Sequence, residues 1–110
     1  MSDRLATWYE GPPVVLPSLL LCDFGNLARE IADLEAAGAR GLHLYVMDGH
    51  FVANMTYGMT IVRAVRQATE LPLDVHLMIS DPGRHVEAFA EAGADMLTIH
   101  AEAVDDPTPV

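Results

Sequence analysis

Three histidines lie in three separate apolar stretches of the chain, and each shares its strand face with other chemically useful side chains. The three sets are His43 with Tyr45 and Met47, His76 with Asp74 and Met78, and His100 with Thr98 and Glu102. Every second side chain of a β-strand lies on the same face, so each histidine points to the same side as its companions. Neutral imidazoles that converge from neighbouring strands can bind a divalent metal ion, with a carboxylate completing the set.

A second interpretation of these histidines is that they are hydrogen-bonded core residues. No short-range ligand motif of the HExxH type is present to favour the metal, and from spacing alone both interpretations stay open. Asp74 shares a face with His76 and is expected to be buried, where a carboxylate needs a partner. Orienting a histidine would supply that partner. Asp48-Gly49 is typical of a turn.

Short apolar runs alternate with amphipathic stretches along the chain. We predict strands over 14–21, 41–47, 73–79 and 95–101, and helices over 24–37, 58–69 and 82–92. Asp23 is a suitable N-cap, and Gly38 stands where a glycine often follows a helix. This alternation predicts an α/β fold of four parallel strand–helix units. The aliphatic faces should pack under the helices, and the mixed faces should point to a common interior, as in a parallel barrel.

The two ends of the sequence carry different signals. Residues 1–13 read as a loose lead-in that closes at Gly11-Pro12-Pro13. Asp105-Asp106-Pro107 repeats the helix-opening pattern of Ser80-Asp81-Pro82, and three residues later the sequence stops. We therefore expect a truncated barrel, or one that self-associates or pairs with a complementary half to cover its open sheet. A frayed tail is the alternative.

Composition excludes several classes of partner. The chain has 16 acidic residues against six arginines, and its net charge of −10 disfavours nucleic acids and anionic membrane surfaces. Cys22 is the only cysteine, so no intramolecular disulfide forms, which fits a cytoplasmic protein. The first residues lack a signal-peptide pattern, and no stretch approaches the roughly 20 apolar residues of a spanning helix.

Four segments resemble the ribulose-phosphate 3-epimerase family, in that family's order and spacing. They are PSLLLCDF (17–24), HLYVMDGHFVANMT (43–56), LPLDVHLMISDP (71–82) and AGADMLTIHAEA (92–103). The resemblance implies the N-terminal half of a TIM (β/α)8 barrel, with 14–110 as a partial ribulose-phosphate-binding barrel. It also implies metal-dependent interconversion of ribulose 5-phosphate and xylulose 5-phosphate by proton transfer at C3.

The resemblance assigns roles to individual positions. A divalent ion (Zn, Fe, Mn or Co) would be held by His43 and His76, and a pentulose phosphate would contact Ser18, Met47, His76 and Met78. The family's aspartate that serves as metal ligand and acid/base corresponds to Tyr45. A phenol has a reference pKa near 10 against about 4 for aspartate, so it is a poor base at neutral pH.

We therefore expect no catalytic residue within this chain. Asp48 lies on the opposite face from His43, and Asp74 lies further from the carboxyl end of its strand than His76, so neither replaces the missing acid. The family's second catalytic aspartate and its phosphate-binding loops belong to later strands. The alternatives are a non-catalytic half-barrel, either a pseudoenzyme or an interaction module, and a hexulose-phosphate 3-epimerase, which shares these motifs.

Overall fold

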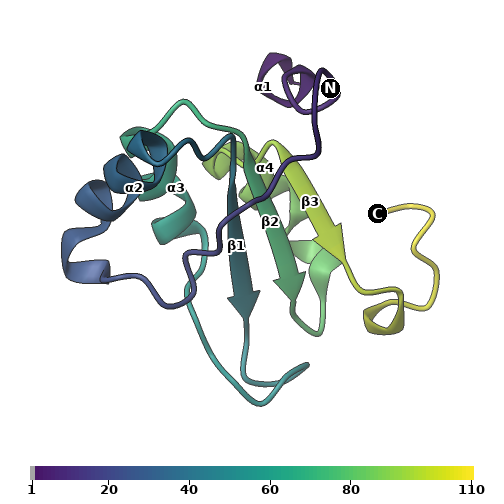
Figure 1. The fold of residues 1–110 in the computed structure, drawn as a ribbon. Helices are drawn as coiled ribbons and strands as arrows, with labels where there is room; N and C mark the ends of the chain where they lie inside the picture. The colour runs from purple at the N-terminus through teal and green to yellow at the C-terminus, as the bar shows by residue number, and fades with distance from the viewer. Residues whose placement is uncertain (1) are drawn as a thin grey trace.

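A parallel sheet backed by helices organises the protein, as seen in a computed structural model that describes residues 2–110. Within these residues the sheet has three strands in the order β1-β2-β3 (Figure 1). The strands are β1 (Leu42–Met47), β2 (Leu73–Met78) and β3 (Met96–Ile99). The main helices are α2 (Leu27–Ala36), α3 (Met59–Ala68) and α4 (Val86–Ala92). Helix α3 joins β1 to β2, and α4 joins β2 to β3, which confirms the predicted α/β alternation.

Short turns of 3-10 helix begin or end several of these elements. They are η1 (Phe24–Asn26), η2 (Pro82–Arg84) and η3 (Ala101–Ala103). Asp23 accepts a hydrogen bond from the Gly25 amide at 3.0 Å, so the predicted cap opens η1 rather than α2 itself. Gly38 and Gly93 follow α2 and α4 with φ of 95° and 124°, a conformation that favours glycine.

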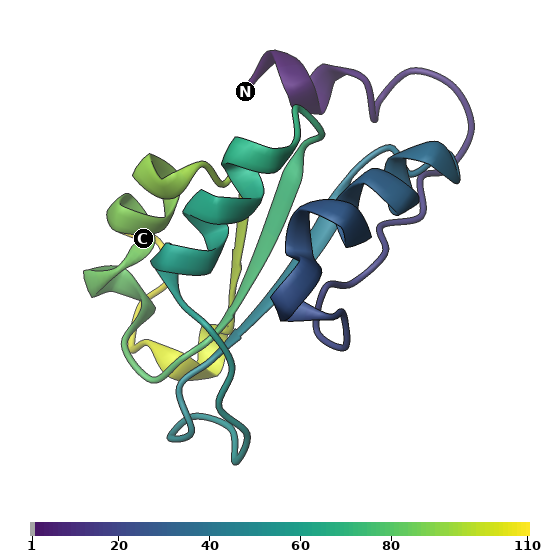
Figure 2. The same cartoon turned by 90° about the vertical axis from the view of Figure 1, so that its left-hand side faces the viewer.

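The core lies between the sheet and its helices. The aliphatic faces of β1 and β2 are buried, as predicted, against side chains from all three main helices. These residues are Leu42, Leu44, Val46, Leu73, Val75 and Leu77 from the strands, and Ile31, Val62, Val65 and Phe89 from the helices. Figure 2 shows α3 and α4 on one side of the sheet, with α2 packed beside α3. The mixed faces of the strands therefore point away from the helices.

The segment 14–21 corrects one of the predicted strands. It makes a single bridge to β1, between Ser18 and His43. The Leu19 amide donates to the His43 carbonyl and the His43 amide to the Pro17 carbonyl, each at 3.0 Å. Further along the same edge, loop side chains bond the backbone of β1 instead: Tyr57 accepts from the Tyr45 amide at 3.1 Å. The amide and carbonyl of Tyr45 are bonded by loop side chains, so they are not free to pair with residues 14–21 as a strand would.

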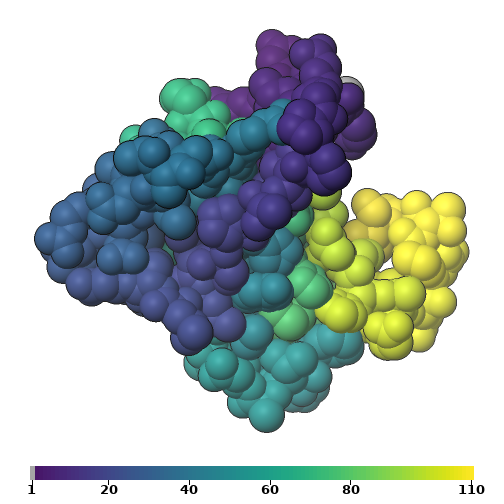
Figure 3. All heavy atoms as spheres, viewed as in Figure 1, coloured from purple at the N-terminus to yellow at the C-terminus, as the bar shows by residue number. Residues whose placement is uncertain are grey.

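The lead-in packs closely on the body of the protein. It contains a short helix, α1 (Asp3–Ala6), whose Leu5 is buried. The Trp8 indole donates to the Arg40 carbonyl at 2.8 Å, and the Ser2 hydroxyl donates to Asp95 at 2.7 Å. Figure 3 shows this segment lying over the body, whereas the last residues project from the β3 side. Within residues 2–110, no helix has the length and apolar character needed to cross a membrane.

Candidate functional site

Aromatic and imidazole rings gather on the sheet face opposite the helices. Ring centroids lie 4.4 Å apart for His43 and Tyr45, 5.6 Å for Tyr45 and His76, and 4.8 Å for His76 and His100. Tyr45 and His76 are register partners across the β1–β2 pair. The predicted common interior thus brings all three histidines together, with Tyr45 among them.

Asp74 orients one of these histidines. Its Oδ2 lies 2.7 Å from Nδ1 of His43, its register partner on β1. Because a carboxylate only accepts, Nδ1 of His43 donates the hydrogen in this contact. Asp74 is only 8% exposed, as predicted, and its Oδ1 is buried without a hydrogen-bond partner among the described residues. The predicted partner was a histidine, and the structure identifies it as His43.

The other two histidines contact each other directly. Nε2 of His76 lies 2.7 Å from Nε2 of His100, and Nδ1 of His100 lies 3.4 Å from a carboxylate oxygen of Glu102. Burial lowers the pKa of His76, and the neighbouring His100 and His43 lower it further, against a smaller opposing effect of Asp74. At neutral pH His76 is therefore an uncharged imidazole, which donates from one ring nitrogen and accepts at the other.

Tyr45 lies beside two of the three histidines in the cluster. Its ring contacts both His43 and His76, and its backbone amide donates to the Tyr57 hydroxyl. Burial raises the pKa of Tyr57 to about 12, although that hydrogen bond opposes the shift. The two tyrosines thus have separate tasks: one fills the ring cluster, and the other binds the β1 backbone.

The remaining predicted site residues surround this cluster. Met47 and Met78 are register partners, two residues beyond Tyr45 and His76 towards the carboxyl ends of β1 and β2. Ser18 reaches His43 through its backbone bridge, and its hydroxyl accepts from the Leu20 amide at 3.1 Å. By strand parity, the predicted site residues on β1 and β2 share one sheet face and extend along the length of the two strands, from His43 to Met47 and Met78.

Asp48 has a structural role that strand parity did not reveal. Its Oδ1 accepts from the amides of His50 and Phe51 at 2.9 and 2.8 Å. Its Oδ2 accepts from the amide and hydroxyl of Ser80 at 2.9 and 3.1 Å. These donors, the Ser80 amide first, hold the pKa of Asp48 well below its usual range. Asp48 thereby ties together the loops that follow β1 and β2 and positions Phe51, whose ring lies 5.1 Å from that of His100.

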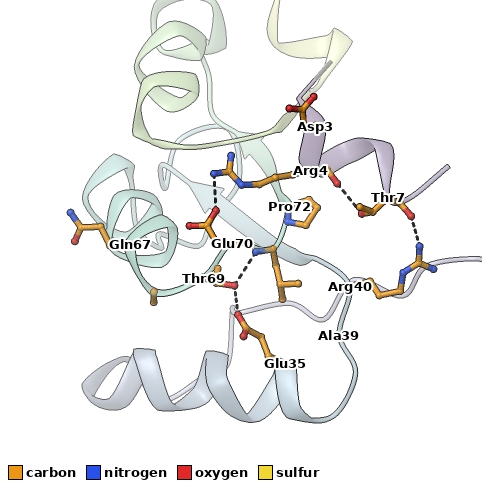
Figure 4. A pocket seen from close by; sticks show the side chains of 12 residues that line it. Asp3, Arg4, Thr7, Glu35, Ala39, Arg40, Gln67, Thr69, Glu70 and Pro72 are labelled. Atoms are coloured by element: carbon orange, nitrogen blue, oxygen red, sulfur yellow. Dashed lines mark hydrogen bonds and ion pairs between the residues drawn. The ribbon is translucent and has the colours of Figure 1, made fainter. Parts of the chain in front are cut away.

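A groove at the amino ends of the strands belongs to the packing of the lead-in. It is lined by residues of α1, the end of α2 and the turn that precedes β2, including Thr7, Arg40 and Pro72 (Figure 4). Arg4 pairs with Glu70 there at 3.1 Å. None of the three clustered histidines lines this groove, so it is not part of the candidate site.

The cluster does not provide the metal-binding set that the sequence resemblance implies. Among residues 2–110, no three His, Cys, Asp or Glu side chains are grouped so that they could hold a metal ion. His43 and His76 offer two imidazoles, but Tyr45 stands between them in place of a carboxylate, and Nε2 of His76 is turned towards His100. We therefore assign no chemical step to a metal at His43 and His76.

Comparison with known proteins identifies the relatives of this chain. The model of the ribulose-phosphate 3 epimerase family matches residues 14–110. The chain is 60% identical over 89 residues to the ribulose-phosphate 3-epimerase of Bacillus subtilis, covering 81% of this chain and 41% of that protein. It is 55% identical over 87 residues to that of Treponema pallidum, covering 79% and 40%. For Mycobacterium tuberculosis the identity is 48% over 100 residues, covering 91% and 43%.

The matches also bear on the predicted architecture. The chain spans about 40% of the length of the curated relatives it matches. That share and the three parallel strands agree with the predicted N-terminal half of a (β/α)8 barrel.

Proposed function

Because the chain belongs to the ribulose-phosphate 3-epimerase family, we propose that it supplies part of the substrate surface for the interconversion of ribulose 5-phosphate and xylulose 5-phosphate by proton transfer at C3, with turnover impaired in this chain. The observation that carries this proposal is the ring cluster on the sheet face opposite the helices. His76 is part of this cluster, Met47 and Met78 follow two residues further along β1 and β2, and Ser18 bridges to His43 from the preceding segment. We propose that Ser18, Met47, His76 and Met78 contact the pentulose phosphate, and that the protein works in the cytoplasm.

The chain contributes this surface without a catalytic base. Removing a proton next to a carbonyl needs a base and stabilisation of the resulting negative charge. Tyr45 occupies the position of the family's acid/base, and a phenol with an ordinary pKa near 10 is rarely ionised at neutral pH. A divalent Zn, Fe, Mn or Co ion would stabilise that charge. The role of His43 and His76 as its ligands stays a prediction, because Tyr45 rather than a carboxylate lies beside both imidazoles.

A non-catalytic half-barrel is the second candidate, and Tyr45 is the observation that favours it. In this role the chain would be a pseudoenzyme or an interaction module that pairs with another copy or with a complementary half. A hexulose phosphate as substrate is a variant of the first candidate, since it would use the same cluster.

Binding of the sugar phosphate tests the proposed surface directly. The chain with labelled methionine methyl groups is titrated with ribulose 5-phosphate and, separately, with a hexulose 6-phosphate, and followed by NMR. We expect the methyl signals of Met47 and Met78 to shift with ribulose 5-phosphate, whereas the exposed Met55 does not respond. A shift with the hexulose 6-phosphate alone would support the variant. No shift with either compound at millimolar concentration would contradict the proposed substrate surface.

Turnover distinguishes the two candidates. The chain is assayed for conversion of ribulose 5-phosphate with added manganese, iron, zinc or cobalt salts. We expect no epimerisation above the metal-free blank, because Tyr45 is a poor base. Conversion above that blank would exclude the non-catalytic candidate.

A further inference from the structure

The first residues of the chain reach across the amino ends of all three strands. Ser2 bonds to Asp95, which directly precedes β3, and Trp8 bonds to the backbone of Arg40, two residues before β1. Because β2 lies between β1 and β3, the segment between these two contacts spans the whole sheet. Figure 1 shows its helix α1 beyond the amino ends of the strands. We call residues 2–13 the strap.

One end of the strap completes the hydrogen bonding of a buried carboxylate. The side chain of Asp95 is only 3% exposed. Its Oδ2 accepts from the Arg66 guanidinium and from the Leu73 amide, both at 2.9 Å. Its Oδ1 accepts from the Ser2 hydroxyl at 2.7 Å and from the Arg4 guanidinium at 3.5 Å. Both donors to Oδ1 within residues 2–110 belong to the strap, so opening the strap would leave this oxygen without a protein partner.

The other end of the strap occupies space that a glycine leaves free. The Trp8 indole donates to the Arg40 carbonyl at 2.8 Å. A Cβ atom at Gly41 would lie 2.4 Å from Cζ2 of Trp8 and 2.8 Å from Cδ2 of Leu16. The φ of Gly41 is not positive, so the close approach of the Trp8 ring, and not the backbone conformation, favours glycine here. The Arg40 guanidinium in turn donates to three strap carbonyls, those of Thr7, Glu10 and Pro12.

The two anchors of the strap stand at equivalent positions of an internal repeat. The sequence Ala-Gly-Ala precedes both Arg40 and Asp95. Each of these residues lies between a helix and the strand that follows it, α2 and β1 for the first, α4 and β3 for the second. Their opposite charges suit their tasks, because the carboxylate accepts from strap donors and the guanidinium donates to strap carbonyls. Between the anchors Leu5 is only 6% exposed, so its burial holds the middle of the strap.

We propose that the strap fastens the amino ends of β1 and β3 and opens only when the sheet itself unfolds. The alternative is a terminal segment that frays on its own, as the first residues of many domains do. Polar anchors at both ends and a buried leucine between them favour the strap. The family model matches residues 14–110, so the folded unit extends beyond the matched part of the chain. The proposal is independent of the proposed function, because no strap residue belongs to the ring cluster.

Native-state hydrogen exchange of the unaltered chain tests the proposal. The indole NH of Trp8 and the amides of β2 are followed by NMR at urea concentrations below the unfolding midpoint. We expect the indole NH to exchange only through global unfolding, with a protection factor within about tenfold of that of the most protected β2 amides. A protection factor more than about tenfold below that of β2 would mean that the strap opens alone, and would overturn the proposal.

Two neighbouring aromatic residues provide matched variants for urea unfolding. Trp8→Ala should raise the unfolding equilibrium constant at least about tenfold, whereas Tyr9→Ala, at a residue that is 69% exposed, should change it less than about threefold. Gly41→Ala should also raise the constant about tenfold in the unaltered chain, but less than about threefold in the Trp8→Ala background, where the ring that the new Cβ meets is gone. Equal effects of Trp8→Ala and Tyr9→Ala, or an equal cost of Gly41→Ala in both backgrounds, would overturn the proposal. The exchange measurement does not depend on the folding of any variant.

Discussion

Tyr45 decides what the cluster of rings can do. It contacts His43 and His76 and fills the position at which the family resemblance expects an aspartate. A neutral phenol neither removes a proton at neutral pH nor binds a divalent ion well. If the family's roles apply at this position, tyrosine in place of aspartate removes a base and a metal ligand together.

Replacing Tyr45 tests this interpretation. Tyr45→Asp should bind Zn²⁺ at least tenfold more tightly than the unaltered chain does. In this variant Zn²⁺ should also shift the imidazole NMR signal of His43, because a carboxylate then lies beside both histidines. Calorimetry and histidine NMR measure the two effects. Tyr45→Phe is the matched control and should bind Zn²⁺ as the unaltered chain does. An affinity of Tyr45→Asp equal to that of Tyr45→Phe would show that a carboxylate at this position does not complete a site.

The sequence predicts which strand face a side chain lies on, but not which residue of the next strand it contacts. From strand parity we predicted that His43, His76 and His100 share one face and that Asp74 is buried beside a histidine. The structure confirms both predictions. It could not identify the histidine, because the register between β1 and β2 depends on packing of the two strands. For the same reason it could not predict that His76 would bond His100.

At the scale of elements, the outer edge of β1 depends on side chains from the loop that follows it. Thr56 accepts from the Met47 amide at 2.9 Å and donates to the Tyr45 carbonyl at 2.7 Å, and Tyr57 accepts from the Tyr45 amide. The helices and the other strands were predictable because their apolar periodicity is strong. The segment 14–21 was wrongly predicted as a strand, because an apolar run does not show that its partner edge is already occupied.

Removing one of these side-chain hydrogen bonds should weaken the fold. Tyr57→Phe leaves the Tyr45 amide without its acceptor in a partly buried setting, which costs about 1–3 kcal/mol of unfolding free energy. Tyr9→Phe is the matched control, because Tyr9 is 69% exposed, and it should change stability little. Urea unfolding measures both variants. Equal midpoints for the two would mean that Tyr57 does not support the edge of β1.

The same residue should make the fold sensitive to alkali. The native pKa of Tyr57 is about 12, above the ordinary value near 10, so the unfolded chain loses this proton first. Stability due to this group is complete below about pH 10 and is lost as the pH rises towards 12. The chain contains no lysine to mask the effect. Urea midpoints between pH 9 and 11.5 should fall more steeply for the unaltered chain than for Tyr57→Phe, and parallel curves would refute this role.

At the scale of the whole molecule, the sheet has a covered face and an incompletely covered one. β3 lies at one edge, and its Met96, Leu97 and Ile99 are only partly buried. Val15 and Leu21, in the segment beside the opposite edge, are 82% and 94% exposed. Exposed strand edges and apolar side chains favour association.

We therefore predict that the chain self-associates. Two copies can cover each other's edges, so light scattering should give a mass about twice the 11.9 kDa of the single chain. Charged substitutions on the open side, Val15→Asp and Leu21→Asp, should shift the equilibrium towards monomer, whereas Ala103→Asp on the separate η3 turn should not. A monomer that unfolds cooperatively at all concentrations would contradict this prediction.

The most direct measurement of the central claim, that the cluster has lost its base, is deuterium exchange at C3 of the sugar phosphate. The chain is incubated with ribulose 5-phosphate or xylulose 5-phosphate and Zn²⁺ in D₂O, and loss of the C3 proton signal is followed by NMR. We predict no exchange above the protein-free rate for the unaltered chain. Tyr45→Asp should exchange the C3 proton of one epimer slowly without converting it to the other, because a single base reaches C3 from only one side of the sugar. Exchange by the unaltered chain at a rate equal to or above that of Tyr45→Asp would contradict the claim.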